Sequence, residues 1–167
     1  MKELYYAVFE TRLGWMGVLS SIKGLLWLKF PVSTYEVARK EIGQAEGWIF
    51  SPPKFSGLIS RLQDYTSGIF SEFPDELDLS GATAFQRKVW NTTRLIPYGE
   101  TRSYGWIARF VDNPRGPRAV GQALGRNPLP IIIPCHRVLA SRNTLGGFTG
   151  GLQMKQRLLN LEGITYG

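Results

Sequence analysis

The sequence contains one cysteine and one histidine, and the two are neighbours. Cys135 is followed by His136 and then by Arg137. A lone cysteine is usually a small buried apolar residue without chemistry. Here an imidazole and a guanidinium come next in the chain, and positive surroundings lower the pKa of a thiol and raise its thiolate fraction, the nucleophilic form. The sequence therefore predicts that Cys135 acts as a nucleophile.

A cysteine nucleophile needs a base, and the base needs a third group that orients it. In an extended segment, consecutive side chains point to opposite faces, so His136 can act on Cys135 only across a sharp turn or through a water molecule. The third group would hold the imidazole and stabilise its cation. After residue 80 the carboxylates are few: Glu100, Asp112 and Glu162. Glu162 follows a predicted helix over 152–161 that could bring it to the site, although a glutamate near a helix end is usually solvated.

The residues before Cys135 predict a rigid support. Ile131–Ile133 is a short apolar run that Pro134 ends, which places Cys135 at the end of a buried strand or turn. One cysteine and one histidine cannot supply the four ligands of an ordinary Cys/His zinc site, so we expect neither a metal nor a cofactor. A single cysteine forms no internal disulfide, which fits a reducing compartment.

Charge is distributed unevenly along the chain. Residues 1–79 contain eight Lys/Arg and ten Asp/Glu, whereas residues 80–167 contain twelve and three. A basic second half predicts a surface for a polyanion, with a solvated basic surface as the open alternative. The hydrophobic segments are far shorter than the roughly 18 residues of a membrane helix. With no signal-peptide pattern at the N-terminus, we expect a soluble, intracellular protein of the cytoplasm.

The first half predicts strands followed by helices. Aromatic and apolar runs separated by Gly-containing turns predict an antiparallel meander. Ser33, with Glu36 three residues on, predicts the start of a helix that ends near Gly43. The predicted strands are 5–11, 16–21 and 25–30, and a second helix is predicted over 55–66. The acidic segment 73–78 reads as a linker. We therefore expect a mixed α+β (α/β) fold with domains at 1–79 and 80–167.

The second half predicts a pair of short helices. Thr83 and Gln86 form a capping box that opens a first helix. Ser103 can cap a helix over 104–111, and Pro117 suits the first position of another, over 118–126. A helix, a short turn and a second helix in a basic region are typical of helix-turn-helix proteins, although such pairs often only pack together. Small residues on the second helix, such as Ala119 and Gly121, favour docking in a minor groove.

Several motifs resemble one family. Pro134-Cys135-His136-Arg137-Val138, preceded by Asn127-Pro128, is similar to the active-site signature of the O6-alkylguanine–DNA alkyltransferases. Further motifs fall in that family's order and approximate spacing: Phe85-Gln86, Val89-Trp90, Pro97-Tyr98-Gly99, Ser103-Tyr104, Arg118-Ala119-Val120-Gly121, Gly146-Gly147, Leu158-Leu159 and Glu162-Gly163. The resemblance covers about residues 80–165, whereas the first 75 or so resemble the family's N-terminal domain only in size and element order.

The resemblance implies a fold and a reaction. It implies a ribonuclease H-like N-terminal domain and a winged helix-turn-helix-like C-terminal domain. It implies a monomer that binds double-stranded DNA through the minor groove and rotates an O6-alkylguanine, or an O4-alkylthymine, out of the duplex. The alkyl group moves irreversibly to the cysteine, so each molecule acts once as a suicide DNA repair enzyme.

The resemblance also implies roles for individual residues. Cys135 accepts the alkyl group, His136 takes its proton through a water, Glu162 polarises His136 and Asn127 braces the turn. Tyr104 crowds the nucleotide's phosphate and donates a proton to the leaving base, and Arg118 fills the gap in the base stack. The remaining contacts are the carbonyls of Cys135 and Val138, the N–H of Thr149, the ring of Phe148, and DNA contacts by Arg115, Ala119 and Gly121.

Three features depart from the family pattern. Phe148 stands where many relatives have Tyr, Trp106 is bulky for its helix, and the zinc ligands of some relatives' N-terminal domains are missing. Three other functions remain as alternatives. A non-catalytic sensor of alkylated DNA would have the cysteine replaced, a helix-turn-helix regulator would not use it, and a cysteine hydrolase would need an oxyanion hole that the sequence does not reveal.

Overall fold

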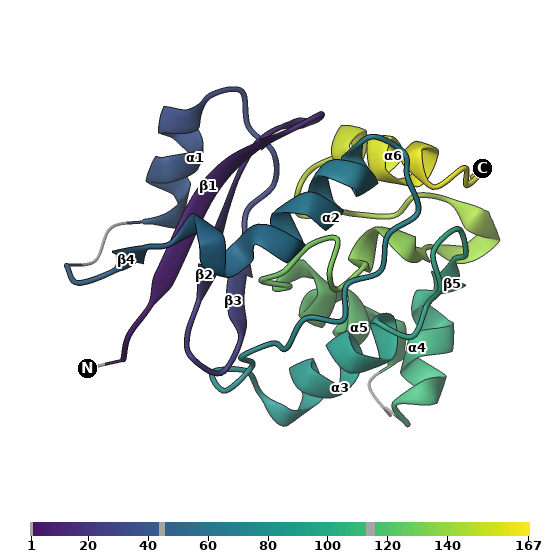
Figure 1. The fold of residues 1–167 in the computed structure, drawn as a ribbon. Coiled ribbons are helices and arrows are strands. Elements are labelled where there is room, and N and C mark those ends of the chain that lie inside the picture. The colour runs from purple at the N-terminus through teal and green to yellow at the C-terminus, as the bar shows by residue number, and fades with distance from the viewer. Residues whose placement is uncertain (1, 44–45, 113–115) are drawn as a thin grey trace. The chain divides into compact units, whose positions relative to one another are not determined.

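The computed structural model describes residues 2–43, 46–112 and 116–167, which form two compact units, 1–81 and 82–167 (Figure 1). The sequence places the domain boundary two residues earlier, after residue 79. Within the described ranges, no helix combines the length and apolar character that crossing a bilayer would require.

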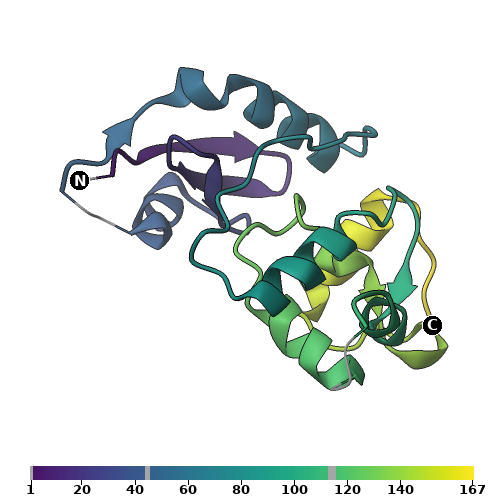
Figure 2. The ribbon, with the colours of Figure 1, turned by 90° about the horizontal axis from the view of Figure 1, so that it is seen from below.

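The first unit is a four-stranded sheet between two helices. The predicted meander is confirmed and forms β1, β2 and β3, while a short β4 pairs parallel to β1 and was missed. A strand of two residues leaves no periodic pattern to detect. Figure 2 shows α1 and α2 on opposite faces of this sheet. The elements are β1 (Tyr5–Thr11), β2 (Gly14–Ser20), β3 (Leu25–Leu28), α1 (Tyr35–Ile42), β4 (Ile49–Phe50) and α2 (Ser56–Thr66).

The start of α1 differs from the prediction by one residue. Thr34, not Ser33, is the N-cap, and its hydroxyl accepts the Val37 N–H at 3.2 Å. Thr34 has the extended backbone of an N-cap residue, so the expected capping box between Ser33 and Glu36 is wrong. The predicted end is confirmed, because Gly43 takes φ +91° there.

The segment 73–78 is bound to the first unit instead of forming a loose linker. The Leu25 N–H donates to Glu76 O at 2.9 Å, and the Asp78 N–H donates to Leu25 O at 2.8 Å. The buried Asp78 carboxylate accepts from the hydroxyls of Ser21 and Ser80, which lower its pKa to about 2. The linker interpretation is therefore wrong, because backbone pairing with Leu25 and the hydrogen bonds of Asp78, which the composition does not reveal, fix the segment to the sheet.

The second unit is mainly helical. The predicted capping box of Thr83 and Gln86 is confirmed at the start of α3, and Ser103 caps α4 by accepting the Trp106 N–H. Trp90 Nε1 donates to Ala123 O at 2.9 Å, which fastens α3 to α5. The elements are α3 (Ala84–Thr93), β5 (Arg102–Ser103), α4 (Tyr104–Phe110), α5 (Gly116–Gly125), β6 (Val138–Leu139) and α6 (Leu152–Leu161), with β5 parallel to β6.

Candidate active site

Cys135 is held by two consecutive tight turns. Pro134, at φ −78° and ψ 63°, forms an inverse γ-turn in which the Cys135 N–H donates to Ile133 O at 2.7 Å. Cys135–Arg137 is then a 3₁₀ turn, with the Arg137 N–H donating to Pro134 O at 2.9 Å. The preceding Ile131–Ile133 is buried and forms a turn, one of the two arrangements that its apolar run predicts. Cys135 and His136 therefore lie on a sharply turned backbone.

Asn127 fastens this turn to the end of α5. Its amide Nδ2 donates to Ile133 O at 2.8 Å and lies 3.1 Å from Cys135 Sγ, while its Oδ1 accepts the Leu129 N–H at 2.8 Å. The side chain thus holds the backbone before and after Pro130 and offers a hydrogen-bond donor to the sulfur. A thiolate would gain most from this donor, because hydrogen bonds to charged atoms are the strong ones.

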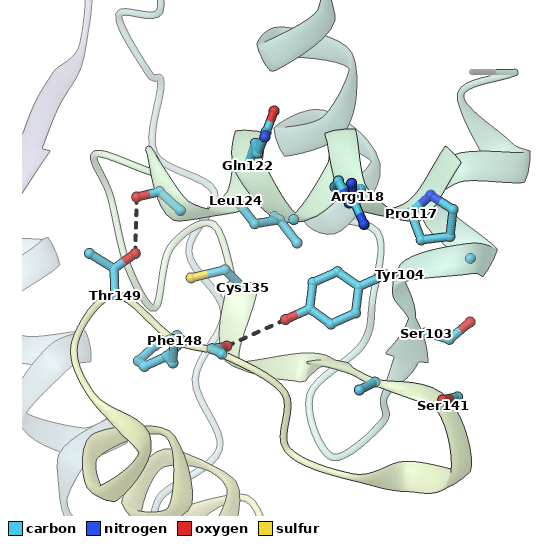
Figure 3. Close-up of a pocket in the computed structure, with 15 residues that line it drawn as sticks. Ser103, Tyr104, Pro117, Arg118, Gln122, Leu124, Cys135, Ser141, Phe148 and Thr149 are labelled. Atoms are coloured by element: carbon cyan, nitrogen blue, oxygen red, sulfur yellow. Dashed lines mark hydrogen bonds between the residues drawn. The ribbon is translucent and has the colours of Figure 1, made fainter. Parts of the chain in front are cut away.

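Cys135 reaches a cavity of about 940 Å³ in the second unit. Figure 3 shows the cysteine between α5 and the segment that carries Phe148 and Thr149. The residue is only 7% exposed, and burial raises the pKa of its thiol to about 11, although the Asn127 amide and the Lys155 charge act in the opposite direction. The expectation that the basic sequence neighbours lower this pKa is therefore wrong.

Burial is the main reason, and Arg137 does not offset it because it is bound to a carboxylate. Its guanidinium donates to Glu162, with Nε 2.8 Å from Oε1 and Nη2 3.2 Å from Oε2. Its charge is therefore largely neutralised by a carboxylate and does little for the sulfur. The ring of Tyr98 lies 5.7 Å from the guanidinium carbon, and Ile96 O accepts from Nη1.

Glu162 and His136 form a buried pair. His136 Nε2 lies 2.5 Å from Glu162 Oε2, and neither side chain is exposed. Burial lowers the pKa of His136 from its usual 6.5, against the raising effect of Glu162, so the imidazole is neutral. Burial alone would raise the pKa of Glu162, but hydrogen bonds and charges from His136 and Arg137 lower it to about 2. The ionised carboxylate accepts, so Nε2 carries the imidazole proton.

We expect Glu162→Gln to destabilise the protein by about 3 kcal/mol at pH 7, because the Arg137 guanidinium would remain buried without a counter-charge. Urea unfolding would measure this. A carboxylate whose folded pKa is about 2, below its ordinary 4.5, stabilises the fold fully above pH 4.5 and loses that contribution as pH falls toward 2. The difference in the free energy of unfolding between wild type and variant should therefore shrink as the pH falls from 4.5 toward 2. Glu100→Gln removes an exposed carboxylate and is the matched control. An equal loss of unfolding free energy in Glu162→Gln and Glu100→Gln would contradict the argument that the buried position of Glu162 matters.

The walls of the cavity come from three elements. α4 supplies Tyr104, α5 supplies Arg118 and Gly121, and the 140–149 segment supplies Phe148 and Thr149. The Tyr104 hydroxyl donates to Gly147 O at 3.4 Å, and Thr149 Oγ1 donates to Gly125 O at 2.9 Å (Figure 3). The 140–149 segment is thus fastened to both helices.

Gly146 leaves room for the Tyr104 side chain. Its φ is +65°, and a Cβ on it would approach the Tyr104 ring and hydroxyl to 3.3 Å, closer than nearly all such contacts, whereas a Cβ on Gly121 would make only an ordinary contact with the ring at 3.9 Å. Burial raises the pKa of Tyr104, so its hydroxyl keeps its proton. The arrangement presents a phenolic donor beside Cys135.

Sequence reasoning missed Lys155, the fully buried lysine of α6. Its ammonium donates to the backbone carbonyls of Val138, Leu145 and Gly147, and burial lowers its pKa to about 8. Its spacing from Leu158 and Leu159 places it on the core face of the helix, and a charged residue at such a position needs buried partners. A charged residue on the apolar face of a predicted helix was therefore the sequence signal that could have identified Lys155.

The other predicted residues are distributed as follows. Val138 lies in β6, and its carbonyl accepts from Lys155, while Cys135 O accepts the Val138 N–H. Ala119 lines a smaller hollow on the other flank of α5. Trp106 is half-buried and packs on Phe110 with ring centroids 5.1 Å apart, so its bulk stays out of the cavity lining. Arg115 lies outside the described residues.

Comparisons with known proteins identify the family. Residues 84–164 match the family model "6-O-methylguanine DNA methyltransferase, DNA binding domain". The methylated-DNA–protein-cysteine methyltransferase of Methanosarcina acetivorans is 39% identical over 96% of this chain and 99% of its own length. The enzyme of Mycolicibacterium paratuberculosis is 42% identical over 94% of this chain and 91% of its own.

A solved structure agrees with this assignment. Mycobacterium tuberculosis OGT, solved in complex with DNA, superposes with a TM-score of 0.80 at 39% identity, covering 95% of this chain and 92% of that one. Both units of the chain are therefore covered, including the first, whose sequence motifs are weak. The chain belongs to the methylated-DNA–protein-cysteine methyltransferase (O6-methylguanine-DNA methyltransferase) family.

Proposed function

We propose that this protein repairs alkylated DNA by moving the alkyl group from guanine O6 to Cys135 Sγ, once per molecule. As a member of its family it is a methylated-DNA–protein-cysteine methyltransferase that binds DNA and reverses the damage directly. The observation that carries the residue assignment is the position of Cys135. It lies in the wall of a cavity of about 940 Å³, next in the chain to an imidazole that a buried carboxylate orients.

The reaction is a single displacement. The lesion-bearing base rotates out of the duplex into the cavity, because chemistry on a base requires it to leave the stack. The sulfur bonds to the alkyl carbon as the bond from that carbon to O6 breaks, and the electron pair stays on guanine. The product is a thioether, which cannot regenerate the thiol by hydrolysis at neutral pH, so the protein is consumed. An O4-alkylthymine is smaller and is a second candidate substrate.

His136 is the base that makes the thiolate. A thiol with a pKa of about 11 is almost entirely protonated at neutral pH, so a nearby acceptor is needed. The neutral imidazole holds its Nε2 proton toward Glu162, and Nδ1 receives the thiol proton through a water molecule. The carboxylate then stabilises the imidazolium. Asn127 stabilises the thiolate through its amide, 3.1 Å from the sulfur.

Tyr104 assists the leaving base. Its hydroxyl keeps its proton and can donate it toward the guanine ring as negative charge develops there, which stabilises the transition state more than the ground state. The carbonyls of Cys135 and Val138 and the N–H of Thr149 hold the guanine edges. Lys155 supports this arrangement, since it binds Val138 O, Leu145 O and Gly147 O and so joins the two sides of the base site.

α5 is the element that enters the minor groove. Its buried side carries Val120, Ala123 and Leu124, while Arg118 and Gln122 are exposed. Small residues let the helix approach the bases closely, and Arg118 fills the space that the everted base leaves. We propose that the protein acts as a monomer, as its family resemblance implies. The place of action is the DNA itself, in the nucleoid or the nucleus.

We expect Arg118→Ala to slow repair of a duplex roughly 30- to 150-fold, because about 2–3 kcal/mol of the cost of base extrusion would no longer be offset. Reaction with free O6-methylguanine base should change by less than about 2-fold, since no extrusion is needed. Single-turnover kinetics with both substrates measure this difference. Arg157→Ala, on the exposed side of α6, is the control. An equal loss with both substrates would refute the role.

Transfer of a labelled methyl group tests the function as a whole. Increasing amounts of a duplex with labelled O6-methylguanine should label the protein up to one methyl per chain and then stop. Continued release of label with protein unmodified would indicate a hydrolase, and binding without label transfer would indicate a sensor or a regulator.

A further inference from the structure

α5 separates two hollows in the second unit. One is the cavity that contains Cys135. The other, of about 300 Å³, lies on the opposite flank, and Gln122 borders both. Figure 3 shows the Gln122 side chain directed away from Cys135 and Tyr104. The second hollow is lined by Thr83, Phe85, Gln86, Ala119, Gln122, Ala123 and Arg126.

The second hollow has the polar chemistry of an anion site. Its lining includes the exposed cation of Arg126, the amides of Gln86 and Gln122, and no carboxylate. Gln86 Oε1 accepts the Thr83 N–H in the capping box, which leaves its Nε2 as a donor. Within residues 2–43, 46–112 and 116–167, no carboxylate lies at ion-pair distance from Arg126. Among the described residues, Arg126 is therefore a cation without a counter-charge.

A helix in the minor groove of DNA is wide enough to contact the DNA on both of its flanks. An α-helix with its side chains is about 10–12 Å wide, whereas the minor groove of B-DNA is about 6 Å wide. A helix that enters this groove therefore touches the sugar-phosphate backbones on both sides. The lesion strand must lie on the flank with Cys135, because the everted base enters that cavity. The complementary strand then passes over the other flank.

We propose that the second hollow binds a backbone phosphate of the complementary strand, with Arg126 as the charged contact. The proposal rests on the proposed docking of α5 in the minor groove. Arg118 and Arg126 are eight residues apart, about 12 Å along the helix axis, and each acts on a different strand. The site is sequence-independent, because phosphates carry no base information.

Salt-dependent binding of an undamaged duplex tests the contact. Arg126→Gln should weaken duplex binding about 5- to 20-fold and reduce the slope of log K against log salt by about 0.9, the value of one phosphate contact. Binding of the single strand that corresponds to the lesion strand, without its complement, should change by less than about 2-fold, because the strand that Arg126 contacts is absent. Arg157→Gln, which removes an exposed arginine that lines neither hollow, should leave all these values unchanged.

Replacing charged phosphates by neutral methylphosphonates, one strand at a time, identifies the strand that Arg126 contacts. Methylphosphonates in the complementary strand opposite the lesion position should weaken binding by wild type and have little further effect on Arg126→Gln. The same groups in the lesion strand should weaken both proteins. The proposal is overturned if Arg126→Gln binds single strands as poorly as duplexes, or if complementary-strand methylphosphonates weaken both proteins equally.

The two proposals fail separately. Methyl transfer from free O6-methylguanine base to Cys135 does not involve Arg126 and should proceed at the wild-type rate in Arg126→Gln. Loss of that reaction in wild type would contradict the proposed function, whereas the binding measurements on undamaged DNA would still report on the second hollow.

Discussion

We expect Cys135→Ser to abolish methyl transfer from O6-methylguanine DNA and to leave DNA binding within about 2-fold of wild type. A serine hydroxyl is a far weaker acid than a thiol, so it stays protonated where the thiolate is needed, and its oxygen is the poorer nucleophile. The smaller side chain still fits the turn and can accept from Asn127, whose Nδ2 lies 3.1 Å from the sulfur. Labelled methyl transfer and fluorescence anisotropy measure the two effects.

The Cys135→Ser result needs a control that separates chemistry from pocket shape. Ser141 lines the same cavity and is exposed, so Ser141→Ala should retain transfer. Transfer that persists in Cys135→Ser would mean that a different residue accepts the methyl group. Loss of DNA binding together with transfer would mean that the substitution disrupts the fold.

We expect His136→Gln to slow transfer by about 10²–10⁴-fold, the usual contribution of a general base. The wild-type rate should be nearly constant from about pH 7 to 8.5, because the imidazole, whose pKa burial lowers below 6.5, is neutral there and takes the thiol proton. In the variant the thiolate must form by loss of the proton to solvent. Since burial raises the thiol pKa to about 11, the variant's rate should rise about tenfold per pH unit.

The pH profile of the His136→Gln variant distinguishes a base from a packing residue. Gln can still donate to the Glu162 carboxylate, so the buried cluster keeps a partner for it. A variant that is slower but has the same flat profile as wild type would show that His136 only positions Cys135. A loss smaller than about tenfold would argue against any role as the base.

Local signals in the sequence identified the elements that carry the site. The capping box at Thr83, the N-cap at Ser103 and the bounds 152–161 of the last helix are all confirmed. These features depend on side chains within four residues of one another, which a sequence displays directly. Glu162 could be chosen because carboxylates are scarce after residue 80, and the structure places it against His136.

Features that depend on distant partners could not be predicted. The raised thiol pKa follows from burial, and Arg137, the nearest cation in the sequence, is bound instead to Glu162, 25 residues away in the chain. The three carbonyls around Lys155 come from a strand and a loop that its own helix does not specify. The pairing of Leu25 with the 76–78 segment is likewise long-range. Each requires the tertiary fold.

The mass of the intact protein after one exposure to a duplex carrying O6-methylguanine tests the central assignment most directly. The account predicts a gain of one methyl group per chain, with peptide mapping that places it on the sulfur of Cys135 and guanine restored in the DNA. A methyl group on any other residue, or repaired DNA beside protein of unchanged mass, would contradict it.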